Sequence, residues 1–279
     1  MTNFKRSTIF AAAVGFVTLM TGHNAEAATI KTETLAAWDQ RIAESETKVI
    51  AERADPERFV SATHGKAAKA QLLNAAEGPA IWGGMSAVPS GLIHHWTGVV
   101  FVRDAHARDL VRVLQDYDAY SDIFKPAVVE SNLVGQTSSS FRYRLKFVEK
   151  GFHVKAGLAG DFRTDYFRLD DETGYTITQA ERLVELQNPA TANETELLFD
   201  ASHGYVERMF TIVRYHETAG GLSVELESIV LSRNIPAAVR WMVAPLVERF
   251  SRQTLSSTIK SLSEAVEHSR ALESAASTR

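Results

Sequence analysis

Histidine is the side chain of this sequence best suited to metal binding or to proton transfer near neutral pH. Candidate positions are His94, His95, His153, His203 and His216. His94 and His95 are adjacent on an expected strand, where successive side chains point to opposite faces, so they cannot both bind one metal ion. Because the five also lack the spacing of a zinc motif, we predict no metal and no other cofactor. One of the adjacent pair should border the interior of the fold, and His95 is the weak candidate for a general base.

Two aspartates flank a tyrosine near the end of an expected helix. Asp116 and Asp118 are two positions apart, so their side chains do not converge on one point, and a glycosidase-like pair is not predicted. Tyr117 and Tyr120 in the same segment are candidates for the mouth of a pocket.

Glu225 and Glu227 share one face of an expected strand near the end of the sheet. The opposite face is the more apolar one, so we expect it to point inward and the two glutamates to point outward. There they would pair across strands with arginines such as Arg208, Arg214 or Arg233.

The composition excludes several classes of protein. The 279 residues include 34 Asp plus Glu, 30 Lys plus Arg and no cysteine, for a net charge of −4. The absence of cysteine excludes disulfides, thiol catalysis and thiolate metal sites, and the charge balance gives no basic field for nucleic acid. The sequence also lacks the nucleophile elbow, the zinc-protease motif, the phosphate-binding loop and the dinucleotide fingerprint.

Residues 1–27 have the three parts of a secretory signal peptide. Lys5 and Arg6 form a basic start, an apolar run follows from Ile9 to Met20, and Ala25-Glu26-Ala27 supplies small residues before a cleavage site. The apolar run is shorter than the roughly 20 residues that a bilayer crossing needs. We therefore predict cleavage after Ala27, export to the periplasm or the medium, and no membrane span in the mature chain.

Residues 28–90 are expected to form a helical N-terminal extension. Apolar residues near helical spacing predict a helix over residues 29–55, and an Ala-rich stretch from Phe59 to Ala76 predicts a second, weaker helix. Glycine and proline pairs around Ile81-Trp82 then favour a domain boundary near residue 90.

Residues 91–270 carry the pattern of an antiparallel sheet followed by a long helix. About seven strand segments alternate in hydrophobicity, most clearly in FRYRLKF at Phe141–Phe147, and short turn sequences between them favour hairpins. Near the end we expect a short helix through Trp241, a break or kink at Pro245, and a long helix to about His268. In the long helix, Leu255, Ile259, Leu262 and Val266 form one apolar stripe. Residues 271–279 are expected to be a flexible tail.

Three stretches of this sequence resemble the START-like superfamily, also called SRPBCC or Bet v 1-like. They are GLIHHWTGVVFVRDAHARDLVRVLQDYDAYSDIFKPAVVESNLV at Gly91–Val134, LSVELESIVLSRNIP at Leu222–Pro236 and WMVAPLVERFSRQTLSSTIKSL at Trp241–Leu262. The chain is also similar to secreted bacterial members with a helical N-terminal extension. The resemblance implies an α+β helix-grip fold, in which a curved antiparallel sheet wraps around a long C-terminal helix.

The resemblance also implies an interior cavity that takes up a hydrophobic small molecule or a lipid. The residues that we expect to bind such a ligand are His95, Trp96, Tyr117, Tyr120, Phe124, Tyr143, Phe147, Ser228 and Trp241.

Three functions remain open at this point. The first is an exported binding protein without chemistry. The second is an enzyme of the polyketide cyclase or dehydratase kind, in which a cavity His or Tyr transfers protons. The third is a protein-interaction module with a filled interior. An apolar cavity with a few hydroxyls would favour binding, convergent His, Asp, Glu or Arg side chains would favour catalysis, and a solid interior would favour the third.

Overall fold

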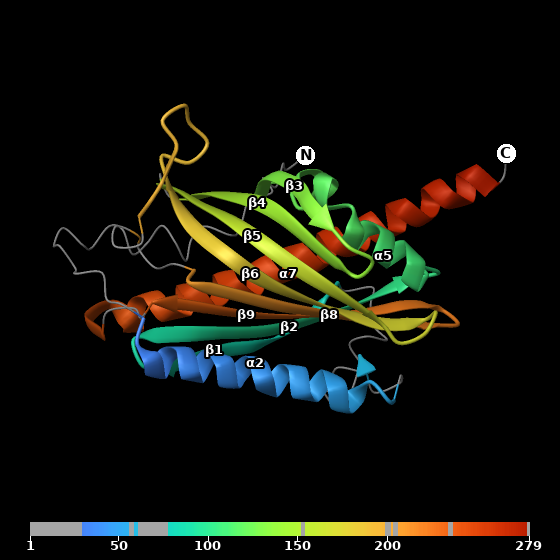
Figure 1. Cartoon of the computed structure of the whole chain (residues 1–279), viewed down its shortest axis with the longest axis horizontal. Helices are drawn as coiled ribbons and strands as arrows, with labels where there is room; N and C mark the ends of the chain where they lie inside the picture. Colours follow the sequence, from blue (N-terminus) through green and yellow to red (C-terminus); the bar gives the residue numbers. More distant parts are fainter. Residues whose placement is uncertain are drawn as a thin grey trace, which may run out of the picture.

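The fold is described from a computed structural model of the chain (Figure 1). The residues that the structure describes are 30–55, 59–60, 78–151, 154–198, 202, 206–233 and 237–277. The predicted leader, the predicted second helix after residue 60, His153 and His203 lie outside these ranges. The side chain of Trp241 also lies outside the described part, although the helix that carries it is described.

One antiparallel sheet forms the centre of the molecule. Its strands are β1 (Ala80–Val88), β2 (Gly91–Arg103), β3 (Val128–Gln136), β4 (Ser140–Gly151), β5 (Val154–Arg168), β6 (Thr173–Gln187), β7 (Thr195–Glu196), β8 (Arg208–Thr218) and β9 (Gly221–Arg233). Hydrogen bonding places them in the order β1-β2-β9-β8-β6-β5-β4-β3, and β7 pairs with β6. The helix-grip prediction is confirmed, with nine strands in the described residues where about seven were expected.

The additional edge strand β1 lies in the segment expected to be part of the helical extension. It pairs antiparallel with β2 over its whole length, from Ala80 to Val88. Gly83 has a φ of 136°, and a Cβ atom there would lie 2.3 Å from the carbonyl oxygen of His95. The glycines that resemble a domain boundary in the sequence therefore allow close approach of two strands instead.

Three short helical segments connect β2 to β3. They are α5 (Ala107–Gln115), the 3₁₀ turn η3 (Tyr117–Ala119) and α6 (Tyr120–Ile123). At the start of α5, the His106 side chain accepts from the backbone of Asp109, and the Asp109 carboxylate accepts from the His106 backbone N–H at 2.9 Å. This capping box fixes where the helix begins, and hence where the tyrosines after it are placed.

The C-terminal helix α7 (Ala237–Ser277) has 41 residues and crosses one face of the sheet (Figure 1). We call this the inner face. The helix continues through Pro245, so of the expected break or kink the break is wrong and a kink stays a prediction. The helix also continues beyond its expected end near His268. Within the described residues, no helix combines the length and the apolar character that spanning a membrane requires.

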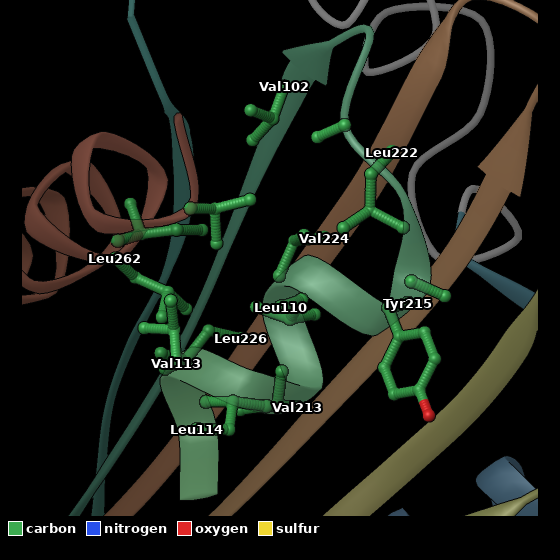
Figure 2. Packing of buried hydrophobic residues seen from close by; sticks show 14 of the residues in the cluster. Val102, Leu110, Val113, Leu114, Val213, Tyr215, Leu222, Val224, Leu226 and Leu262 are labelled. Atoms are coloured by element: carbon green, nitrogen blue, oxygen red, sulfur yellow. The ribbon is translucent and has the colours of Figure 1, made fainter. Parts of the chain in front are cut away.

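The inner face is packed with buried apolar side chains from α5, α7 and the three strands β2, β8 and β9. Figure 2 shows Leu110 and Val113 of α5 among Val224, Leu226 and Leu262. The stripe of Leu255, Ile259, Leu262 and Val266 is buried in this cluster, as its spacing predicted. Gly98 on β2 lies opposite the stripe, which brings α7 close to the strand.

The outer face of the sheet is covered by the N-terminal helix α2 (Thr32–Glu52), which runs along β1 and β2 on the side away from α7 (Figure 1). Trp38 and Val49 of this helix are buried with Ile93, Phe210 and Ile229 of the sheet. The extension therefore completes a second core, and the central strands are buried on both faces.

Candidate ligand-binding cavity

A cavity of about 580 Å³ lies within the grip of the sheet. It is enclosed by α5, η3 and α6, by the inner face of β3 to β6, β8 and β9, and by α7. Its volume lies within the range of roughly 300–1,000 Å³ that is typical of sites for small molecules. A filled interior, which would have favoured an interaction module, is not observed.

Aromatic rings form one end of the cavity. Tyr117 stacks on Tyr143 with ring centroids 4.1 Å apart, and Tyr143 stacks on Phe162 at 5.6 Å. Tyr120 meets Phe124 edge to face at 5.0 Å. The tyrosines on η3 and α6 are placed there by the turn after α5, whereas Tyr143 and Phe162 face inward through the alternation of β4 and β5.

The tyrosine hydroxyls at this end are hydrogen bonded to one another and to the end of α5. Tyr120 and Tyr166 donate to the backbone carbonyl of Leu114 at 2.7 and 2.8 Å. That carbonyl is in the last turn of the helix, where it has no partner within the helix. Since Tyr166 uses its proton there, Tyr117 must donate in its 2.8 Å contact with the Tyr166 hydroxyl.

Burial keeps these tyrosines protonated. It raises the pKa of Tyr117, Tyr120 and Tyr166 well above the usual value, and it raises the pKa of Tyr143 to about 12. Hydrogen bonds from Thr164 and Thr178 lower the pKa of Tyr143 by less than burial raises it. A phenol in this environment is a poor proton acceptor, so the rings serve as packing surface and as hydrogen-bond donors.

Hydroxyl side chains line the two walls beyond the aromatic end. The sheet contributes Thr164, Thr176, Thr178 and Thr211, and α7 contributes Thr254, Ser257, Thr258 and Ser261. Thr164 and Thr178 are cross-strand partners with their hydroxyl oxygens 2.7 Å apart. The positions on α7 recur at i, i+3, i+4 and i+7, so they share one face of the helix.

Charged side chains of the cavity lining lie at its opening. They are Lys125, Lys260 and Glu264, and their side chains are 71%, 61% and 65% exposed. Lys260 lies 3.8 Å from Glu264 on the surface of α7. The buried part of the lining therefore carries apolar groups and hydroxyls without a formal charge.

Five of the residues expected to bind a ligand line this cavity: Tyr117, Tyr120, Phe124, Tyr143 and Phe147. Trp96 and Ser228 lie on the inner face as directly opposed partners of β2 and β9, but outside the cavity lining. Ligand contact at all of these positions stays a prediction.

His95 does not border the cavity, and this expectation is wrong. Its Nε2 lies 2.7 Å from the carboxylate of Glu227 on the outer face, beneath α2. The inner member of the pair is His94, which contacts the Ser232 hydroxyl at 2.8 Å and is also outside the cavity lining. Burial lowers the pKa of His94 to about 4, so this imidazole is neutral at pH 7.

Glu225 and Glu227 point to the outer face as expected, but α2 buries them. Arg214, also fully buried, lies 3.2 Å from Glu227 and 3.6 Å from Glu225, and it bonds Glu52 of α2 at 2.7 Å. Burial raises the pKa of Glu227, but hydrogen bonds from His95 and Ser45 and the charge of Arg214 outweigh it and lower the pKa to about 2. We call Arg214, Glu52, Glu225 and Glu227 the α2 ion cluster.

The described residues hold no group of three or more His, Asp or Glu side chains arranged for a metal ion. The α2 ion cluster is separated from the cavity by the sheet itself, because its members point from the opposite face of β8 and β9. It binds α2 to the sheet and contributes nothing to the cavity.

The order of the elements decides the fold. An antiparallel sheet grips a long C-terminal helix, and a pair of short helices follows the first long strand. The chain has a helix-grip fold. No family model matches its sequence, and no curated protein matches it.

Solved structures that align with this chain include the STAR-related lipid transfer protein of Xanthomonas axonopodis, with 17% identity, a TM-score of 0.47 and coverage of 68% of this chain and 99% of that one. A START superfamily protein of Mycobacterium smegmatis has 13% identity, a TM-score of 0.40 and coverage of 63% and 98%. The Zhui aromatase/cyclase of a Streptomyces species has 19% identity, a TM-score of 0.37 and coverage of 67% and 96%.

The hydroxyl-bearing walls of the cavity were not expected from the sequence. The hydroxyls come from two parts of the fold, and only one of them has a pattern in the sequence. On α7, Thr254, Ser257, Thr258 and Ser261 follow a helical period beside the apolar stripe. On the sheet, the threonines come from three different strands, so they meet only once the register is known.

Proposed function

We propose that this protein binds a hydrophobic small molecule or lipid in the inner cavity, without chemistry, after export from the cytoplasm. The observation that carries the proposal is the cavity of about 580 Å³ with an aromatic end, hydroxyl-bearing walls and charge confined to the opening. Such a lining desolvates an apolar body and leaves a few polar groups to orient it. Export is supported by the leader pattern of residues 1–27.

Proton transfer by a cavity residue is the weaker alternative. The cavity lining contains no histidine within the described residues, and its one carboxylate, Glu264, lies at the exposed opening. The tyrosines are protonated far above neutral pH and are already hydrogen bonded to Leu114, Tyr166 or Thr164. A general base near its operating pH is therefore missing from the described part of the site.

The test is native mass spectrometry of the protein purified from its exporting host, before and after exposure to a total lipid extract. Thr211 faces the cavity from β8, so Thr211→Trp should fill the space, while Val134→Trp, at a position 65% exposed on β3, is the matched control. We expect a bound small molecule on the natural protein and on the control, and none on Thr211→Trp. If the natural protein carries and acquires no ligand, the proposal is refuted.

A further inference from the structure

We infer that the ligand of this cavity is uncharged and carries at least two hydroxyl or carbonyl groups on a rigid apolar frame, set against a row of threonines on the sheet. This inference rests on the proposed binding function and specifies the chemistry of the ligand. The row consists of Thr164, Thr178 and Thr211, on the three adjacent strands β5, β6 and β8.

The row follows directly from strand register. Thr164 is opposite Thr178, and Thr178 is opposite Thr211, so all three side chains point to the inner face at the same level of the sheet. Adjacent strands lie about 4.8 Å apart, so the row presents hydroxyls over about 10 Å. Ser228 on β9 continues it beyond the cavity, where its neighbour across the strands is Trp96.

The hydroxyls of the row are only partly used within the protein. Tyr143 contacts Thr164 at 3.2 Å and Thr164 contacts Thr178 at 2.7 Å, which leaves acceptor capacity on each threonine. Within the described residues, the Thr211 hydroxyl has no hydrogen-bond partner in the protein. The Thr211 side chain lines the cavity and is half-buried, so its hydroxyl is available to a ligand group.

The wall of the cavity opposite the sheet also carries hydroxyl groups. Ser257, Thr258 and Ser261 of α7 line the cavity from the helix side. Hydroxyl groups both donate and accept, so they suit ligand hydroxyls and carbonyls equally well. An ionised ligand group would lose its hydration here without gaining a partner of opposite charge, because the charged lining residues are at the opening.

The contrast between the two ends of the cavity orients the ligand. The rings of Tyr117, Tyr143 and Phe162 offer an apolar surface whose own polar atoms are already paired. The apolar part of the ligand should therefore contact this end, and its oxygens should align with the threonine row. Neighbouring hydroxyls of the row are held one inter-strand distance apart. A ligand whose rigid frame holds its hydroxyls at a similar spacing therefore loses less conformational entropy on binding than a flexible chain does.

The experiment pairs two probes with two variants. Methyl cholate is an uncharged rigid steroid ester with three hydroxyls on one face, and methyl cholanate is the same ester without them. Equilibrium binding of both is measured on the natural protein, on the double variant Thr178→Val/Thr211→Val, and on Thr97→Val. Thr97 lies on the outer face of β2, so that control removes a hydroxyl from the same sheet but not from the cavity. Thermal unfolding establishes that each variant is folded.

We expect the double variant to weaken methyl cholate binding roughly tenfold, because it removes two ligand hydrogen bonds, and to change methyl cholanate binding less than about twofold. The Thr97→Val control should change neither. If the double variant leaves methyl cholate binding intact, or weakens both esters equally, the threonine row does not recognise the ligand and this inference is overturned while the binding function stands. If the natural protein binds neither ester and also acquires nothing from a lipid extract, the binding function itself is refuted.

Discussion

Replacing Arg214 by methionine should strongly destabilise the protein by breaking the α2 ion cluster. Arg214 is fully buried, and it lies within 4 Å of Glu52, Glu225 and Glu227. Removing it leaves the two sheet carboxylates buried next to each other without their cation. Breaking one partner out of a buried ion pair costs about 3–5 kcal/mol, which for a chain of this size lowers the unfolding temperature by roughly 6–20 °C.

The assay for this prediction is urea unfolding at pH 7, with hydrogen exchange of residues 32–52 to follow α2. Exchange in α2 should accelerate in Arg214→Met, since the bond from Arg214 to Glu52 holds the helix to the sheet. The matched control is Arg208→Met, an exposed position on the same strand, which should cost less than about 0.5 kcal/mol.

A rescue variant makes the prediction refutable. Arg214→Met/Glu225→Gln/Glu227→Gln removes the uncompensated charges, so it should recover a large part of the lost stability. Two results would refute the reasoning: a loss below about 1 kcal/mol in Arg214→Met, or a triple variant no more stable than the single one. Either would mean that the buried charges are not the source of the effect.

Four further predictions concern pH, backbone geometry and export. The folded-state pKa of His94 is about 4 against 6.5 in the unfolded chain, so up to about 3 kcal/mol should be lost as the pH falls from 6.5 to 4, and urea unfolding of His94→Gln should lack that loss. Glu227, with a pKa of about 2 against 4.5, should add a further loss between pH 4.5 and 2, absent in Glu227→Gln. Gly83→Ala should cost about 1–3 kcal/mol in thermal unfolding, because its Cβ meets a backbone carbonyl at a positive φ, whereas Gly84→Ala, with nothing within 4 Å, should cost less. Mass spectrometry of exported protein should give a chain that begins at Ala28, and a retained leader would contradict the prediction.

The order of most elements was predictable because each has a local pattern. Period-two alternation marks β4, and the period-3.6 stripe from Leu255 to Val266 marks α7. The wrong predictions concern glycine and proline, whose local preference for turns and helix ends is overridden here by tertiary contacts. The pair Gly83-Gly84 resembles a linker but lies inside β1, and Pro245 removes one helical hydrogen bond without ending α7.

The face of β2 was not predictable because the strand is buried on both sides. His94 shares the inner face with Trp96, whereas His95 lies beneath α2. When a helix covers each face, hydrophobic alternation disappears and no periodic signal says which side is inner. The same helix converts the outward-facing Glu227 from an expected surface residue into a buried one, 5% exposed.

The core on the outer face of the sheet offsets the packing that the cavity removes from the inner face. A cavity of about 580 Å³ on the inner face deprives the sheet and α7 of contacts that a filled core would supply. The outer face supplies a second core instead, in which Trp38 and Val49 of α2 pack on the central strands and Arg214 bonds the helix to β8. The outer core covers β2, β8 and β9, and the cavity lies on the inner face of β3 to β6, β8 and β9, so β8 and β9 carry the outer core on one face and part of the cavity on the other. A domain without disulfides can then keep a cavity on the inner face, because the core on the outer face supplies packing that the cavity does not reduce.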